Sequence, residues 1–240
     1  LGAERAAVLV TGNVKFDQSP GDVSPALMER LSKMLGIEDR PLLLAGSTHE
    51  GEEEGVLSAY DALKKDCPEL SLILAPRHPE RWDRVEKLIV GHGHPVKRRS
   101  TMEEGGQTLD PGTVILLDTI GELSSLYSLC TLAFVGGSLV PKGGQNVLEP
   151  AAQGKAVLFG PHMFNFKEIA RQLIEVSGGF EVRNTQDMIE NARRLLHNKV
   201  EREETGRRAL SVVHRNRGAV ARNVELVERY LNLSTHAAEG

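Results

Sequence analysis

The sequence predicts an α/β domain in which helices cover both faces of a parallel β-sheet. Short apolar runs alternate with segments of helical periodicity along most of the 240 residues, a pattern typical of repeated βα units. The runs are continuous and rich in Val, Leu and Ile, as expected for strands that are buried on both faces. No internal repeat interrupts this alternation.

Eight runs have the length and composition of strands, and the intervening segments have the spacing of helices. The expected strands are 7–10, 42–45, 70–75, 96–99, 114–117, 132–135, 156–159 and 178–182. The expected helices are 25–35, 53–65, 80–90, 122–129, 147–153, 166–176 and 185–198. Charged residues dominate 201–233 over a thin apolar stripe, which predicts C-terminal helices with a solvated face.

Composition excludes several classes of protein. The net charge of −4 and the low aromatic content (4%) argue against a nucleic-acid-binding surface. Cys67 and Cys130 lie far apart without a metal-ligand pattern, so reduced thiols are expected. No run approaches the roughly 18 apolar residues of a membrane-spanning helix.

Small, polar and cationic residues follow the predicted strands where each one ends. In an open parallel sheet these ends share one edge, which is where ligands bind. This convergence predicts a binding site at that edge. The candidates in three of these groups are Ser47 and Thr48, Pro76, Arg77 and His78, and Ile120, Gly121 and Glu122.

A glycine-rich segment, residues 136–150, follows the run 132–135 and contains Ser138 and Gly144. Glycines let backbone N–H groups approach an anion closely, and a helix N-terminus favours negative charge. Asn146 fits an N-cap, and Glu149 stands three residues later, as in a capping box. The Glu149 carboxylate can also accept hydrogen bonds from sugar hydroxyls. We interpret the segment as part of a nucleotide or nucleotide-sugar site, with an ordinary capped loop as the alternative.

Each single candidate also has a purely structural interpretation. Arg77 can pair with a phosphate or stack on a base, or it can form a surface salt bridge. His78 can bind phosphate or cap its loop. Glu122 can be a helix N-terminal carboxylate favoured by the dipole. Ser47 and Thr48 fit turn and cap positions equally well.

Familiar motifs of other enzyme classes are missing from the sequence. There is no GxGxxG after the first expected strand, no GxxxxGK[ST] and no GxSxG, which argues against the corresponding dinucleotide, phosphate-loop and hydrolase sites. His92 and His94 have no neighbouring Cys or carboxylate ligands in sequence, so a metal site is not expected.

Five phrases of the chain together resemble the 3-deoxy-D-manno-octulosonic acid (Kdo) transferases, the lipid A glycosyltransferases of Gram-negative bacteria. The phrases are VTGNVKFD (10–17), AGSTH (45–49), APRHP (75–79), IGEL (120–123), and GGS (136–138) with NVLEP (146–150). They occur in order over most of residues 8–165 and match the C-terminal half of the enzyme. The last phrase alone would indicate only the wider GT-B superfamily.

The resemblance implies the C-terminal half of a GT-B fold, with residues 1–240 forming one Rossmann-like domain that binds CMP-Kdo. Neither a metal nor another cofactor is expected, because the family is metal-independent. The implied contacts are Pro76 and Arg77 with CMP, Ile120, Gly121 and Glu122 with cytosine, and Asn146, Val147, Leu148 and Glu149 with ribose and phosphate. Ser47, Thr48, His78, Ser138 and Gly144 are further candidates for contacts with phosphate or sugar.

The resemblance also implies a role in lipopolysaccharide biosynthesis at the cytoplasmic face of the bacterial inner membrane. The acceptor, a lipid A precursor, would bind an N-terminal domain outside this chain, and that domain would supply the membrane contact and the catalytic base. Arg77 and the amides of the glycine segment would stabilise the leaving group. We therefore expect this chain to bind CMP-Kdo and to transfer no sugar alone.

Two alternatives stay open at the level of sequence. The chain can belong to another GT-B enzyme, such as a UDP-sugar transferase or epimerase. It can also be a stand-alone nucleotide-binding module.

Overall fold

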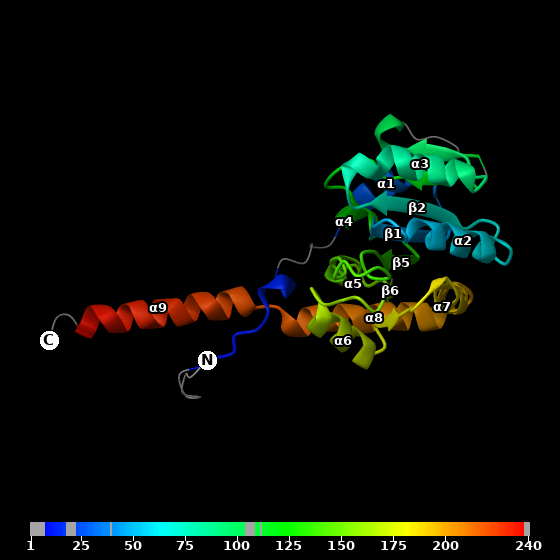
Figure 1. The fold of residues 1–240 in the computed structure, drawn as a ribbon. Helices are drawn as coiled ribbons and strands as arrows, with labels where there is room; N and C mark the ends of the chain where they lie inside the picture. The colour runs from blue at the N-terminus through cyan, green and yellow to red at the C-terminus, as the bar shows by residue number, and fades with distance from the viewer. Residues whose placement is uncertain (1–7, 18–22, 39, 104–108, 111, 238–240) are drawn as a thin grey trace.

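The computed structural model describes residues 8–17, 23–38, 40–103, 109–110 and 112–237. Within them, seven strands form one parallel sheet in the order β3-β4-β2-β1-β5-β6-β7 (Figure 1). The α/β class is therefore confirmed. The strands are β1 (Leu42–Thr48), β2 (Ser71–Pro76), β3 (Val96–Arg98), β4 (Val114–Leu116), β5 (Leu132–Val135), β6 (Val157–Phe159) and β7 (Gly179–Glu181).

Helices cover both faces of this sheet. One face packs against α2 (Glu53–Lys64), α3 (Trp82–Gly91) and α7 (Thr185–His197), and the other against α1 (Pro25–Leu35), α4 (Leu123–Leu126), α5 (Leu148–Ala152), α6 (Lys167–Glu175) and α8 (Lys199–Asn216). Successive residues of β1 divide between the two sides: Leu43 contributes to the core under α2, and Leu44 to the core under α1. This alternation explains why the strand is apolar throughout.

The order of the strands creates a switch point between β1 and β5. On one side of β1 lie β2, β4 and β3, in that spatial order, and after β4 the chain crosses back to place β5 on the other side of β1. Crevices at such points, outside the carboxyl ends of the strands, are where open α/β sheets bind ligands. A Cβ on Gly46 would lie 2.0 Å from the Tyr127 hydroxyl oxygen, so this glycine leaves room for the Tyr127 ring at that edge.

The predicted first strand, 7–10, is wrong over its described residues. Val8, Leu9 and Val10 belong to no strand and are 54%, 57% and 93% exposed. The apolar run resembles a strand in composition, but β3 and β7 form the edges of the sheet and neither pairs with it. Residue 7 lies outside the described residues. The largest difference in helix length is at α4, which ends at Leu126 instead of 129, and a 3-10 turn (Pro79–Arg81) occupies the predicted start of α3.

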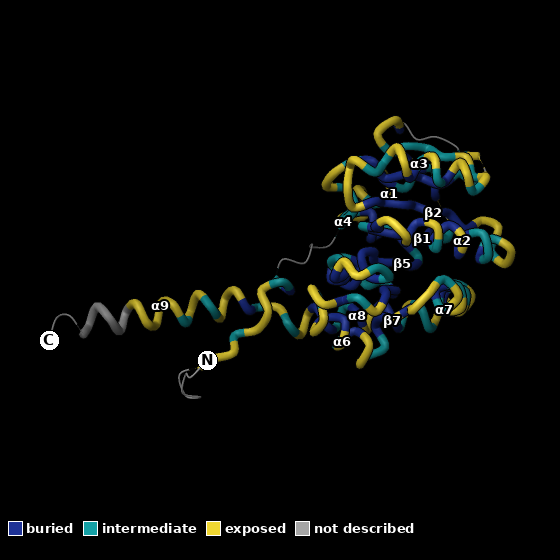
Figure 2. Tube along the Cα trace, in the orientation of Figure 1, coloured by how far each residue is buried: buried dark blue, intermediate teal, exposed yellow. Residues whose placement is uncertain are grey.

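The charged C-terminal region forms two helices, α8 and α9 (Ala219–Ala237), rather than one continuous segment. Arg217 is extended and Gly218 has a φ of +91°, which separates them. Val213 of α8 is fully buried, whereas Val220 and Val224 of α9 are exposed. Helix α9 extends away from the sheet and carries few buried residues (Figures 1 and 2). Among the helices of the described ranges, none is long and apolar enough to cross a membrane.

The N-terminal segment is tied to the start of α9. Phe16 inserts into the core formed by α5, α6 and α8. The Asp17 carboxylate accepts hydrogen bonds from the backbone N–H groups of Gly218 and Val220, and these bonds lower the pKa of Asp17. Arg222 donates to the carbonyl of Thr11 at 2.7 Å. Residues 11–17 and 218–222 therefore lie side by side.

Candidate nucleotide-binding site

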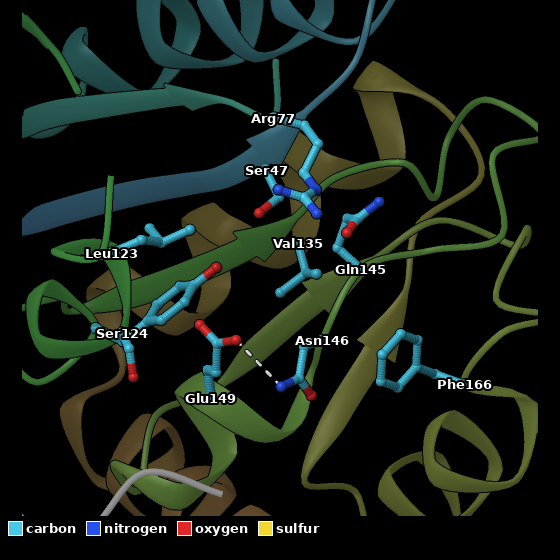
Figure 3. Close-up of a pocket in the computed structure, with 11 residues that line it drawn as sticks. Ser47, Arg77, Leu123, Ser124, Val135, Gln145, Asn146, Glu149 and Phe166 are labelled. Atoms are coloured by element: carbon cyan, nitrogen blue, oxygen red, sulfur yellow. Dashed lines mark hydrogen bonds between the residues drawn. The ribbon is translucent and has the colours of Figure 1, made fainter. Parts of the chain in front are cut away.

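A cavity of about 370 Å³ opens at the carboxyl ends of β1 and β5 (Figure 3). A second cavity of about 180 Å³ adjoins it, and the two share Ser47, Arg77, Gly121 and Leu123. The predicted convergence of strand ends therefore forms a continuous hollow at the switch point. The sequence-predicted residues that line it are Ser47, Pro76, Arg77, Ile120, Gly121, Asn146 and Glu149; their contacts with a ligand stay predictions.

The cavity has a cationic side and an anionic side. Arg77 reaches in from the end of β2, and Glu149 from α5, so that the guanidinium and the carboxylate face the same space (Figure 3). Burial raises the pKa of Glu149, and the hydrogen bond from Asn146 and the charge of Arg77 partly oppose that rise. A ligand with an anionic group and hydroxyl groups fits this polarity, because each end of the cavity offers the complementary partner.

Asn146 fixes the position of Glu149. Its side-chain amide donates to Glu149 Oε1 at 3.1 Å, and its carbonyl oxygen accepts from the backbone N–H of Leu148 at 3.1 Å. The amide is thus held at both ends. The predicted cap position of Asn146 is wrong by one residue, because the N-cap of α5 is Val147 and it makes no side-chain cap hydrogen bond. The predicted position of Asn146 in the cavity is present in the structure.

Arg77 is held by its backbone while its side chain stays available. Its N–H donates to the carbonyl of Thr48 at 2.9 Å, which joins the ends of β2 and β1. Within the described part of the chain, no carboxylate lies within ion-pair distance of Arg77, whereas its neighbours Arg81 and Arg84 pair with Glu53 and Glu50. The surface salt bridge considered for Arg77 is therefore not formed among these residues.

Ser47 has a strained backbone at the edge of the cavity. Its φ is +55°, a left-handed conformation that costs a non-glycine residue about 1–2 kcal/mol. The strain coincides with a register shift between Gly46 and Thr48 of β1. This irregularity turns Ser47 into both cavities. Thr48 is fully buried instead, and its hydroxyl oxygen has no hydrogen-bond partner among the residues that the structure describes. Thr48 therefore does not line the site as expected.

Several predicted residues face the core rather than the cavity. Val147 and Leu148 are fully buried in the core formed with α6 and α8, whereas Asn146 and Glu149 on either side of them line the cavity. Ser138 is also fully buried, and its hydroxyl donates to the carbonyl of Val135 and accepts from the N–H of Gly160. The N–H of Gly144 donates to the carbonyl of Gly137. The side chains of 146–149 therefore do not all form one wall of the cavity.

Three backbone N–H groups of the glycine segment donate hydrogen bonds to a side chain of the protein itself. The fully buried carboxylate of Glu52 accepts hydrogen bonds from the N–H groups of Gly137, Ser138 and Leu139 at 2.7–3.0 Å. A Cβ on Gly136 would lie 2.9 Å from Glu52 Oε2. In this structure these three amides therefore face Glu52 and not a ligand phosphate. The glycines do allow an anion to approach the backbone, but the anion is Glu52.

Glu122 and His78 lie near the site without lining either cavity. Glu122 pairs with Arg99 at 2.7 Å and accepts a hydrogen bond from the hydroxyl of Thr119. It also immediately precedes α4, in line with its structural interpretation. His78 is exposed, lies 3.8 Å from the Glu80 carboxylate, and meets the His49 ring edge-on with 5.2 Å between ring centroids.

His49 is a buried part of the site that the sequence analysis did not single out. Its Nε2 lies 3.2 Å from the side-chain nitrogen of Gln145, a cavity residue. Burial is the main cause that lowers the pKa of His49 to about 4, and the nearby His78, Arg81, Lys142 and Arg77 contribute to the same shift. The imidazole is therefore neutral at pH 7, and it joins the loop after β1 to the glycine segment without adding charge.

Other lining residues were missed because their strands and helices give no chemical signal in sequence. Tyr127 and Phe166 contribute aromatic walls, and Leu123, Ser124 and Val135 complete the lining. The Lys15 ammonium lies 4.2 Å above the Phe166 ring, which links the phrase at 10–17 to the site. Of these residues, Gln145 could have been predicted from the sequence, because it lies within the glycine segment. Among the described side chains, no group of three or more His, Cys, Asp or Glu is placed to hold a metal ion.

The buried state of His49 predicts a specific dependence of stability on pH. Its folded pKa of about 4 is below the ordinary 6.5, so the unfolded chain binds the proton more readily. The stabilisation is present above about pH 6.5 and is lost as the pH falls toward 4. We expect the free energy of unfolding, measured with urea, to fall less steeply over this range in His49→Gln than in the unsubstituted chain. Substitution of the exposed His197 by Gln should leave the slope unchanged, and equal slopes in all three chains would contradict the assignment.

Comparison with known proteins extends the sequence resemblance. No family model matches the chain. The 3-deoxy-D-manno-octulosonic acid transferase of Haemophilus influenzae is 42% identical over 232 residues, covering 96% of this chain and 53% of that protein. The Bordetella pertussis transferase of the same name is 32% identical and 52% covered. The chain thus spans about half the length of the curated relatives it matches.

Solved structures give the same result for the domain alone. The C-terminal CMP-Kdo binding domain of WaaA from Acinetobacter baumannii has a TM-score of 0.71 and 31% identity, over 78% of this chain and 96% of that one. Anabaena HepE in complex with UDP-glucose has a TM-score of 0.63 over 88% of this chain and 54% of that one. At 17% identity, HepE shares the fold alone. Because the WaaA domain is matched over nearly its whole length, the chain belongs to the Kdo transferase family and corresponds to its C-terminal domain.

Proposed function

We propose that this chain is the donor-binding domain of a Kdo transferase and that it binds CMP-Kdo in the cavity at the β1–β5 switch point. The observation that carries the proposal is the polarity of this cavity, in which Arg77, with no ion-pair partner among the described residues, faces a half-buried Glu149. The chain is also 31% identical to a domain described as CMP-Kdo binding. A sugar nucleotide has the anionic phosphate and the ribose hydroxyls that these two residues complement.

The geometry supports a particular placement of CMP. The phosphate pairs with the Arg77 guanidinium, which offers a planar fork of donors. The ribose hydroxyls donate to the Glu149 carboxylate, held in place by Asn146. The cytosine lies in the smaller cavity, where Pro76 and Gly121 contribute shape and Ile120, 83% exposed, supplies an apolar surface. Glu122 is close enough in sequence to contribute, but it first has to leave Arg99.

In the complete enzyme, the acceptor hydroxyl of a lipid A precursor attacks the anomeric carbon of Kdo. The bond from that carbon to the phosphate oxygen breaks, its electron pair stays on CMP, and the acceptor proton passes to a base. Arg77 stabilises the charge that develops on the leaving phosphate. We propose that this chain contributes no catalytic base and no metal, and that acceptor and inner-membrane contacts at the cytoplasmic face belong to the longer protein.

Nucleotide preference and the loss of Arg77 test this assignment. We expect the 240-residue chain to bind CMP in calorimetry and to bind UDP more weakly. Arg77→Ala should weaken CMP binding about 10- to 100-fold, because a charge-assisted hydrogen bond contributes about 1.5–3 kcal/mol. Arg84→Ala is the matched control, since Arg84 is exposed, pairs with Glu50 and lines neither cavity.

Three results would count against the proposal. Equal or tighter binding of UDP would favour another GT-B enzyme. Equal losses of CMP affinity in the Arg77 and Arg84 variants would move the phosphate away from Arg77. Transfer of Kdo to a lipid A precursor by this chain alone would show that it contains its own base.

Glu149 should separate stability from binding. Burial of its carboxylate raises its pKa, so the folded chain bears a cost at pH 7 that the unfolded chain does not. We expect Glu149→Gln to have an unchanged or higher thermal midpoint and CMP affinity at least about tenfold lower. Calorimetry and thermal unfolding of the same preparations check both parts. A lower thermal midpoint with wild-type CMP affinity would assign Glu149 to the fold instead.

A further inference from the structure

Glu52 connects two loops that lie on opposite sides of the switch point. It directly precedes α2 and is fully buried. Oε2 accepts from the N–H groups of His49 at 2.8 Å and Gly137 at 2.7 Å, and Oε1 accepts from those of Ser138 at 3.0 Å and Leu139 at 2.9 Å. Both oxygens thus receive two backbone donors. Three of the four donors come from a segment 85–87 residues later in the chain.

This arrangement is an anion site that the protein fills itself. Consecutive N–H groups in a turn that contains left-handed residues form a concave site for an anion, and Gly137 has a φ of +65° here. A Cβ on Gly136 would lie 2.5 Å from the Thr48 Cα and 2.9 Å from Glu52 Oε2. A glycine at 136 is therefore needed for the β1–α2 loop and its carboxylate to approach.

The segment that Glu52 holds also carries the cavity residues. From Leu139 the chain continues through Lys142 to Gln145, Asn146 and Glu149, three residues that line the cavity. Two backbone hydrogen bonds close this loop, from Gly144 to Gly137 and from Gln145 to Gly136. The loop thus closes on the same glycines whose neighbouring amides Glu52 engages, so the position of those amides sets the starting point of the cavity wall.

We propose that Glu52 is a positioning residue for donor binding: its carboxylate substitutes for a ligand anion in the glycine segment and orders the wall that carries Gln145, Asn146 and Glu149. The inference rests on the proposed function in that it assigns the donor phosphate to Arg77 and not to the glycine amides. It adds a residue that touches no ligand yet determines donor affinity.

The chemistry of the contact makes the test specific. In Glu52→Gln, one of the two acceptor oxygens becomes an NH₂ group that faces two backbone N–H donors. The near-isosteric amide should therefore be almost as harmful as Glu52→Ala. Acetate contains the two carbons and two oxygens that Glu52→Ala removes, so it should enter the space and restore the contact. Glu54→Gln is the matched control, because Glu54 lies in the first turn of α2 and its side chain is exposed.

The experiment measures CMP affinity of the 240-residue chain by calorimetry, with and without acetate, and amide hydrogen exchange at Gly137, Ser138 and Leu139. For both Glu52 variants we expect affinity at least about tenfold lower, equivalent to about 1.4 kcal/mol, and faster exchange at these amides. Acetate should recover most of the affinity of Glu52→Ala and slow the exchange, and chloride at equal ionic strength should not.

The other outcomes overturn the inference. Wild-type affinity in a folded Glu52→Gln would show that the carboxylate is dispensable. Lost affinity with amides still protected would place the effect elsewhere. Global unfolding of both variants that acetate does not reverse would assign Glu52 to the fold as a whole. If the unsubstituted chain fails to bind CMP, the proposed function fails, and the hydrogen-exchange response to acetate still decides the role of Glu52.

Discussion

The buried contact between Glu52 and the glycine segment is the interaction on which the geometry of this site depends. One carboxylate receives four backbone hydrogen bonds from two loops, and buried charges are tolerated only when they are paired in this way. It joins the end of β1 to the end of β5, the two strands that border the switch point. The cavity lies along this junction, so the buried Glu52 carboxylate holds its two walls in position.

This arrangement assigns different tasks to parts of the site that look alike in sequence. The glycine segment resembles a phosphate-binding loop, yet three of its amides bind Glu52. Arg77 lines the cavity and has no acidic partner among the described residues. Partial burial destabilises the ionised form of the Glu149 carboxylate, which raises its pKa. Strain at Ser47 adds a second local cost at the same edge. Such costs concentrate where a ligand is bound.

Sequence reasoning identified most of the sheet and the residues that stand directly at strand ends, such as Arg77, Gly121 and Asn146. Their positions follow from local pattern and the shared edge of a parallel sheet. It failed for residues 8–10, where an apolar run has no neighbouring strand. It also failed for Val147 and Leu148, because the pattern does not say which side of a short helix faces the core. Glu52 was missed because three of its four hydrogen-bond donors lie 85–87 residues away in the sequence.

A crystal structure of this chain with CMP would show whether the phosphate binds Arg77 or the amides of the glycine segment. We expect the phosphate oxygens to lie within hydrogen-bonding distance of the Arg77 guanidinium and the ribose hydroxyls to bind Glu149. We also expect Glu52 to remain bound to the amides of Gly137, Ser138 and Leu139. A phosphate seated on those amides with the Glu52 carboxylate displaced would contradict these expectations.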